Sequence, residues 1–260
     1  MSTAPDPMLK KWKSLLKRLA ADQPAPPHAA EHPPAPLTVI SAAIHGTLLW
    51  EASFGQARLA YQHLTQHFAD YNDMRVALPT QLILAIGERY PLAAERCVRL
   101  KSWLSDLYRR SSTLDLENLR DVAKPDARER LRSLQGLPDF AAAFAAMTSL
   151  GDHAFPIDER LLKLLVQEKI VEAQTTPAQA MSRLEPLIGP DELPEVYALL
   201  RSWSDHHGAP PRRDGTDAFR PVDIALPPAP RRSDPAPLAA KSKPSAKTSP
   251  RKSKTRPKSK

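Results

Sequence analysis

The chain has 260 residues, of which 42% are hydrophobic, enough to bury one core of one or two lobes. A single cysteine, Cys97, excludes an internal disulfide and a four-cysteine iron–sulfur cluster. We find no signal peptide and no apolar run of about 20 residues, so we expect a soluble cytoplasmic protein that does not bind membranes. The 28 prolines and 8 glycines indicate proline-rich flanks around a helical middle.

The positive charge belongs to the C-terminal part of the chain. Residues 209–260 carry 14 Lys and Arg against 4 Asp, a net charge of +10. Because the whole chain has a net charge of +8, residues 1–208 carry a net charge of −2. The basic composition therefore says little about the folded part, and any face of that part that binds a polyanion must be local.

The first predicted element is a basic amphipathic helix over residues 8–20. Its apolar side chains recur at helical spacing, and basic side chains occupy the other face: Lys10, Lys11, Lys13, Lys17 and Arg18. Three interpretations stay open: docking on the domain by the apolar stripe, an arm on nucleic acid, and a helix on a membrane surface. Residues 24–36 are proline-rich and predict an extended linker, so residues 1–36 form an N-terminal flank.

Helical periodicity then continues through the middle of the chain. We predict helices over 37–50, 54–68, 79–87, 91–108, 114–119 and 126–134. Ser53 is the predicted N-cap of the second, in which Leu59, Tyr61, Leu64 and Phe68 should face inward. In the turn 70–76 we expect Arg75 to pair with a local acid. The polar face of the helix over 91–108 and its end holds Arg96, Arg99, Lys101, Arg109 and Arg110, more consistent with a solvated face than with a DNA patch.

A helical hairpin is predicted at about residues 131–145. Gly136-Leu137-Pro138 makes a turn, and the alanine-rich run 140–147 has strong helix propensity and small side chains that permit close packing. Gly151 should end that helix, and Asp158 should be the N-cap of a helix over 159–167. Arg128, Arg130 and Arg132 should point outward beside the hairpin. We therefore take Arg128 and Arg132 as phosphate-binding candidates.

The folded part should end with two more helices. Thr176 and Pro177 are placed as N-cap and first residue of a helix that runs to about Ile188, and a last helix spans residues 193–206. His206 and His207 are adjacent on a helix, so their side chains point about 100° apart, and we expect no metal site there. Residues 37–208 thus form one helical domain.

Residues 209–260 have 11 prolines, no helical period and no means of burying a core, which predicts a disordered tail. The last twenty residues have 9 Lys and Arg and no acid, a composition that resembles the tails of linker histones. We expect phosphate binding by counterion release. A solubilising tail, or binding to RNA or another polyanion, stays open. The candidate DNA-binding residues of the tail are Lys241, Lys243, Lys247, Arg251, Lys252 and Lys254.

The segment 134–158 resembles the helix-hairpin-helix DNA glycosylases, the endonuclease III-like superfamily. Leu134-Gln135-Gly136-Leu137-Pro138-Asp139-Phe140-Ala141-Ala142 falls on the family's LPGVGRKTA motif without a gap, and Phe155-Pro156-Ile157-Asp158 falls on the segment that ends in the catalytic aspartate. The resemblance implies an all-α, two-lobed fold and a DNA-anchoring hairpin at Gly136, Leu137 and Pro138. It also implies a catalytic role for Asp158, and it puts Glu51 where the family has a glutamine that fills the hole left by a flipped base. A solvated Glu51 at a helix end is the favoured alternative.

Three positions depart from the family pattern. Pro138 replaces the second hairpin glycine, Asp139 replaces an arginine, and Phe140 replaces the lysine that forms a Schiff base. Both hairpin changes should weaken anchoring to phosphate. Without the lysine we expect no apurinic-site lyase activity. The cluster cysteines are also missing, so we expect no cofactor and no metal.

Two functional hypotheses follow from this resemblance. The first is a monomeric protein of base-excision repair that binds double-stranded DNA through hairpin and tail, associates with the nucleoid, and cleaves N-glycosidic bonds by Asp158 and water. The second is a catalytically inactive DNA-binding or chromatin-associated member of the fold, in which Asp158 is a plain N-cap. A protein-interaction module that shares the fold is a third, weaker hypothesis.

Overall fold

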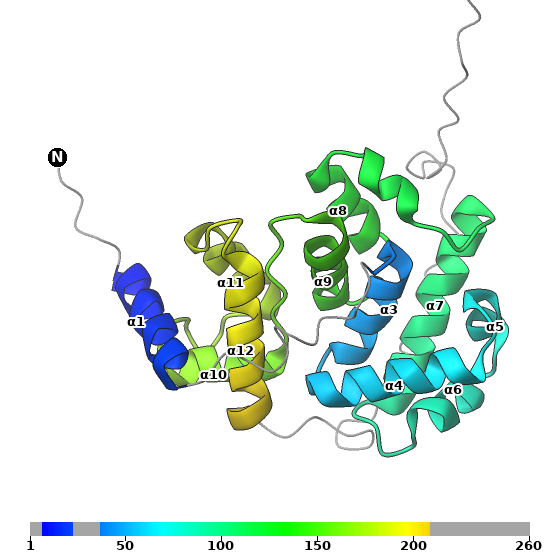
Figure 1. Ribbon diagram of the computed structural model, residues 1–260, viewed down its shortest axis with the longest axis horizontal. Coiled ribbons are helices and arrows are strands. Elements are labelled where there is room, and N and C mark those ends of the chain that lie inside the picture. Colours follow the sequence, from blue (N-terminus) through cyan, green and yellow to red (C-terminus); the bar gives the residue numbers. More distant parts are fainter. Residues whose placement is uncertain (1–6, 23–36, 209–260) are drawn as a thin grey trace, which may run out of the picture.

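The computed structural model describes residues 7–22 and 37–208. Within these two stretches the chain forms α-helices and short 3₁₀ turns, and no strand (Figure 1). The helical fold expected from the sequence is therefore confirmed. In the described residues no helix is long and apolar enough to cross a membrane.

The larger lobe comes from the middle of the chain. It contains α3 (Val39–Leu49), α4 (Phe54–His67), α5 (Tyr71–Val76), α6 (Pro79–Ile86), α7 (Ala93–Ser111), a 3₁₀ turn (Glu117–Asp121), α8 (Lys124–Arg132) and α9 (Asp139–Leu150). The smaller lobe contains α1 (Pro7–Asp22), α10 (Glu159–Gln167), α11 (Pro177–Leu184), a 3₁₀ turn (Glu185–Leu187) and α12 (Leu193–His207). Figure 1 shows α1, α10, α11 and α12 together at one end of the molecule, so helices from both ends of the described chain form one lobe.

Helix α3 is the centre of the larger lobe. All its residues are buried, and it packs most extensively against the alanine-rich α9. At Gly46 the backbones approach so closely that an added Cβ would lie 3.0 Å from the Cα of Ala141. Small residues on both helices therefore allow the contact that the composition of residues 140–147 predicts.

The predicted caps explain where several helices begin. Ser53 and Thr176 each form a capping box, with Gln56 and Gln179 respectively. The carboxylate of Asp158 accepts a hydrogen bond from the backbone N–H of Leu161, so its predicted N-cap position at α10 is confirmed. Cap residues act within one turn of their own helix, which is why the sequence locates them correctly.

Helix α1 docks on the smaller lobe by its apolar stripe, the first of the three interpretations. Trp12, Leu15 and Leu19 are buried, and the ring of Trp12 meets Phe155 edge-on at a centroid distance of 6.2 Å. α1 packs on α12, and its Arg18 pairs with Glu168 at 2.7 Å. Burying three large apolar side chains, each worth about 1.5–3 kcal/mol, is ample to hold the helix in place.

Some sequence expectations for the larger lobe were wrong. Leu59 was expected inside, yet it is 52% exposed on α4. Arg75 does not pair with an acid: it donates to Asn72 Oδ1 and stacks over the ring of Tyr108 at 4.2 Å. The helix expected over 114–119 is a 3₁₀ turn at 117–121. Short elements depend on their neighbours more than on periodicity, which accounts for the last of these.

Arg96 is the largest correction, because the sequence assigned it to a solvated face and the structure buries it completely. Its guanidinium donates to three carbonyls at the end of α3, those of Thr47, Leu48 and Trp50. Burial lowers the pKa of Arg96. The charged guanidinium is stabilised by the negative end of the α3 dipole, where the carbonyls accept no hydrogen bond from within the helix.

The proline-rich linker and the basic tail, including Lys241, Lys243, Lys247, Arg251, Lys252 and Lys254, lie outside the described residues.

Candidate functional site

The predicted hairpin lies between the end of α8 at Arg132 and the start of α9 at Asp139. The N–H of Leu137 donates to the carbonyl of Leu134 at 3.1 Å, which closes the turn. Gly136 has φ +94°, and an added Cβ there would lie 2.9 Å from Cβ of Ser102 on α7. The turn therefore requires glycine both for its left-handed backbone and for its close approach to α7.

An acid that the sequence did not single out anchors this hairpin. Asp106 of α7 is 4% exposed, and its Oδ2 accepts the N–H of Gln135 at 3.0 Å. The same carboxylate pairs with Arg109 and Arg110, and Arg110 donates to the carbonyl of Ser133 at 2.7 Å. Because Asp106 is one charged residue on a long charged helix, its spacing gives no sign that it faces inward.

The hairpin has the two altered residues that the sequence indicated, a buried Pro138 and an exposed Asp139. Pro138 is the N-cap residue of α9 and has no N–H to offer an anion. Asp139 is half exposed and lies 3.3 Å from Arg132, which is equally exposed. A phosphate that approached this turn would meet a carboxylate, and Arg132 is partly neutralised by it.

The sequence predicted that Arg128 points outward, and this prediction was wrong. Its guanidinium donates to Asp152 at 2.6 Å, to Glu185 at 2.9 Å and to the carbonyl of His153 at 2.7 Å. The hydrogen bond to Asp152, supported by the one to Glu185, raises its pKa. Arg128 thus joins α8 to the segment before α10 and to the 3₁₀ turn of the smaller lobe.

Asp158, the candidate catalytic residue, is buried between the lobes with 1% of its surface exposed. Its Oδ1 accepts the N–H of Leu161 at 2.9 Å. Its Oδ2 accepts the N–H of Glu51 at 3.3 Å and a guanidinium N–H of Arg201 at 2.9 Å. The carboxylate is therefore held by three donors from three parts of the chain.

Glu51 lies beside Asp158, and the expectation of a solvated side chain was wrong. It is 1% exposed, has φ +57°, and its carboxylate accepts the N–H of Glu159, the first residue of α10, at 2.7 Å. The N–H of Glu51 in turn bonds to Asp158. A carboxylate is stabilised there because the N-terminus of α10 supplies unpaired N–H groups and a positive dipole.

Arg201 of α12 completes this cluster, and the sequence did not identify it. It is 2% exposed, donates to Asp158 and to the carbonyls of Leu49 and Ala52, and has Nε 3.4 Å from Asp205. Burial by itself lowers the pKa of Arg201, but the charges of Asp158 and its neighbours raise it overall. The guanidinium thus compensates two acids and the carbonyl end of α3.

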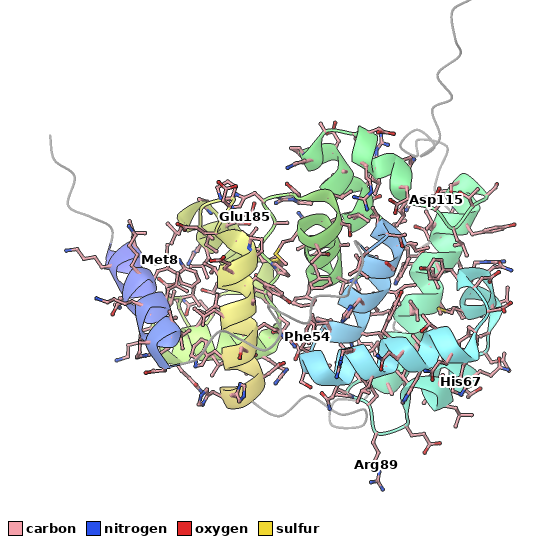
Figure 2. All side chains as sticks on the ribbon, viewed as in Figure 1. Met8, Phe54, His67, Arg89, Asp115 and Glu185 are labelled. Atoms are coloured by element: carbon pink, nitrogen blue, oxygen red, sulfur yellow. The ribbon has the colours of Figure 1, made fainter. Side chains whose placement is uncertain are left out.

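The residues around Arg201 join the two lobes. Arg160 of α10 donates to the carbonyls of Ala52 and Ser204 and pairs with Asp205 at 3.3 Å. Asp205 also accepts the N–H of Phe54 at 2.8 Å, and Figure 2 shows Phe54 where α4 begins, close to α12. We call the set Glu51, Asp158, Arg160, Arg201 and Asp205 the junction.

Phe140, at the position of the missing lysine, borders the junction. It is buried, and the guanidinium of Arg201 lies 5.9 Å from its ring centroid. Phe144 stacks on it at 6.4 Å and contacts Tyr197 of α12 at 6.0 Å. Burial raises the pKa of Tyr197, which keeps this phenol neutral. Asp158 and Phe140 are therefore connected through one side chain, that of Arg201.

Histidines and acids of the described residues form no group of three that could hold a metal ion. The rings of His206 and His207 are 6.4 Å apart, and His206 Nδ1 hydrogen-bonds to the carbonyl of Ser202 at 2.7 Å.

No family model matches the sequence. Among curated proteins, DEMETER-like protein 2 of Arabidopsis thaliana is 33% identical over 104 residues, a match that covers 40% of this chain and 7% of the plant protein. The match thus spans a small part of that much longer protein.

Solved structures give a broader match. A trapped endonuclease III–DNA covalent intermediate superimposes with a TM-score of 0.57 and 13% identity, covering 77% of this chain and 85% of that one. The 8-oxoguanine glycosylase/lyase of Clostridium acetobutylicum gives 0.56 and 11%, covering 76% and 69%. The H. pylori 3-methyladenine DNA glycosylase gives 0.53 and 14%, covering 76% and 96%. The chain therefore has the all-helical fold of the endonuclease III-like, helix-hairpin-helix DNA glycosylases.

Proposed function

We propose that this protein binds double-stranded DNA in base-excision repair and acts as a monofunctional DNA glycosylase. The supporting observation is the position of Asp158: it caps α10 at the boundary of the two lobes, beside the position that carries a lysine in bifunctional enzymes, in a chain with the glycosylase fold. The proposed protein is a monomer that associates with the nucleoid through its tail.

The proposed chemistry needs a carboxylate and no amine. Cleavage of an N-glycosidic bond develops positive charge on the sugar, which the Asp158 carboxylate would stabilise while it orients water. Phe140 has no amine to attack the sugar carbon, so no imine forms and no lyase step follows. The hairpin at Gly136, Leu137 and Pro138 would hold one DNA strand, and Arg132 would contribute a weak phosphate contact.

Excision also requires the junction to open. All three hydrogen bonds to Asp158 come from groups that are themselves buried, and Arg201 occupies the side of the carboxylate toward Phe140. A deoxyribose can reach Asp158 only when Arg201 moves away from Oδ2. In this proposal, DNA binding between the lobes supplies the energy for that movement.

The test is a panel of duplexes with oxidised, deaminated and alkylated bases, read by alkali-revealed strand cleavage. Asp158→Asn should abolish cleavage. Asp205→Asn is the matched control, since it removes another junction acid that also pairs with Arg201. Cleavage that survives Asp158→Asn would contradict the proposed role of Asp158, and cleavage lost equally in both variants would point to the fold rather than to the chemistry.

A second function has its own supporting observation. Because Asp158 is saturated by Arg201 and two backbone N–H groups, it can be wholly structural. The protein would then be a catalytically inactive DNA-binding or chromatin-associated member of the fold. Duplex binding without excision of any base in the panel would favour this function over the first.

The contribution of the tail is tested separately with a chain that ends at Gly208. The proposed tail contacts, Lys241, Lys243, Lys247, Arg251, Lys252 and Lys254, should each release counterions on binding. Truncation should weaken duplex binding and reduce the dependence of the binding constant on salt. An unchanged affinity and an unchanged salt slope would remove the tail from the proposal.

A further inference from the structure

A groove lies on the smaller lobe, beside the docked helix α1. Its volume is about 550 Å³, and it is lined by Met8 and Lys11 of α1, the segment from Val166 to Ala173 after α10, and Arg183 of α11. Figure 2 labels Met8 on α1, at the end of the molecule formed by the smaller lobe. None of the residues that line this groove belongs to the junction or to the hairpin.

The groove has a fixed geometry because α1 is tied to its far wall. Lys11 Nζ donates to the carbonyl of Lys169 at 3.3 Å, and Arg18 pairs with Glu168 at 2.7 Å. On the apolar side of α1, Trp12 is buried against Phe155. The basic side chains of α1 are therefore held on a rigid surface.

The charge of the groove favours an anion. Three cations line it, Lys11, Lys169 and Arg183, against one acid, Glu172, whose carboxylate already accepts a hydrogen bond from Gln174 at 2.6 Å. Within the described residues no acidic partner is recorded for Lys169 or Arg183. Helix α1 adds a net charge of +4, from five basic residues and Asp22, to a domain that is otherwise slightly acidic.

The remaining basic side chains of α1 extend this surface. Lys10, Lys13 and Lys17 are exposed on the outer face of the helix. Cations spaced along a helix beside a groove match the repeated phosphates of a nucleic acid backbone better than they match a single small anion. The apolar lining residues Val166 and Ile170 let the lysine stems pack while their ammonium groups stay in solvent.

We propose that this groove and the outer face of α1 bind the phosphodiester backbone of DNA, as a second contact surface that is separate from the hairpin. The inference rests on the proposed DNA binding and names a further part of the protein that performs it. It assigns α1 two roles at once: its apolar stripe attaches it to the smaller lobe, and its basic face binds phosphate.

The experiment measures binding of an undamaged duplex by the full chain over a range of salt concentrations. The variant K169Q/R183Q removes two groove cations, and R58Q/R89Q removes two exposed arginines from the larger lobe as the matched control. Loss of two phosphate contacts should lower the salt slope by about 1–2 and the affinity by about 10-fold or more. The control should change affinity by less than about threefold, since surface charges away from the contact are screened.

Several outcomes would overturn the inference or separate it from the proposed function. Equal losses in both double variants, or an unchanged salt slope in K169Q/R183Q, would overturn it. Groove-dependent binding of a polyglutamate peptide in place of the duplex would overturn it in favour of an acidic protein partner. Gly136→Ala, measured in parallel, separates this inference from the proposed function: if the hairpin variant loses affinity and the groove variant does not, DNA binding stands and the groove is not part of it. Melting temperatures close to that of the native chain confirm that the groove variants are folded.

Discussion

The junction and the hairpin are the two regions that hold the candidate catalytic and DNA-anchoring residues, and they differ in what surrounds those residues. The junction keeps the acid at position 158 but surrounds it with buried donors. At the hairpin, Gly136 is pressed against α7 and Pro138 is buried, while Asp139 is exposed beside Arg132. The candidate acid is thus enclosed, whereas the candidate anchoring turn has a charged pair at the surface.

The two regions also differ in how far their charged residues contribute to stability. The acids and arginines of the junction are nearly inaccessible to solvent. Each buried charge is therefore stabilised by an opposite charge beside it. At the hairpin, the pair Arg132–Asp139 is about half exposed and contributes little to stability. Substitutions should therefore be costly to folding in the first region and affect mainly ligand binding in the second.

The largest effect is expected from Arg201→Met. The change leaves Asp158, Asp205 and the end of α3 without their shared cation, and the free energy of unfolding should fall by about 3–5 kcal/mol. Denaturant unfolding measures this. Arg89→Met is the control: Figure 2 shows Arg89 projecting from the molecule, and its loss should change stability by less than about 0.5 kcal/mol. Similar values for both variants would mean that the junction charges do not stabilise the fold.

Tyr90 provides a pH test of the same region. Its hydroxyl donates to the carbonyl of Leu48 at 2.8 Å, and burial raises its pKa from 10.0 to about 12. Because the folded-state pKa is the higher one, this stabilisation is complete below pH 10 and is lost as the pH rises through about 12. The expected loss is about 2–3 kcal/mol.

Comparison with Tyr90→Phe isolates that contribution. The variant should lose about 1 kcal/mol at neutral pH, since one buried hydrogen bond is missing. Between pH 10 and pH 12 it should then lose less stability than the native chain. Tyr108→Phe, at a residue that is 41% exposed, is the control. Parallel pH profiles for the native chain and Tyr90→Phe would contradict the assignment.

Two glycines, Gly136 in the hairpin and Gly87 at the end of α6, test the close approach of the hairpin to α7. Gly136 and Gly87 have almost the same positive φ, +94° and +97°, but an added Cβ meets Ser102 at Gly136 and open space at Gly87. Gly87→Ala should cost about 1 kcal/mol for backbone strain alone, and Gly136→Ala about 2 kcal/mol because α7 must also move. Unfolding free energies give the difference. Equal costs would show that the close approach to α7 is unimportant.

The smallest effects are expected at Arg128 and Arg132, the two arginines that the sequence named together as phosphate-binding candidates. Arg128→Gln should lower stability by about 1–2 kcal/mol, because Asp152 and Glu185 lose a partly buried partner. Arg132→Gln should change stability by less than about 0.5 kcal/mol. If Arg132 contacts phosphate, its variant should bind duplex DNA more weakly and with a smaller salt slope. Weaker binding by a folded Arg128→Gln alone would reverse the two assignments.

Much of the fold was accessible from residue patterns. Helix positions followed from apolar spacing, and helix starts followed from Ser53, Asp158 and Thr176. The hairpin was placed correctly because Gly136 and Pro138 limit the backbone locally. Boundaries differed by a few residues, as at α11, which ends at Leu184 and continues as a 3₁₀ turn where a helix to Ile188 was predicted.

The sequence by itself therefore determined the helices, their caps, the hairpin and the motif that places Asp158, since each depends on contacts within one or two turns of chain. Tertiary structure alone decided that Arg96 and Arg201 are buried, that Glu51 caps α10, and that α1 docks. These outcomes join residues 43 or more positions apart, as in Arg201–Asp158 and Glu51–Glu159. A charged residue on a helix has the same periodicity whether it faces water or a buried partner, so only the packing of the helices distinguishes the two.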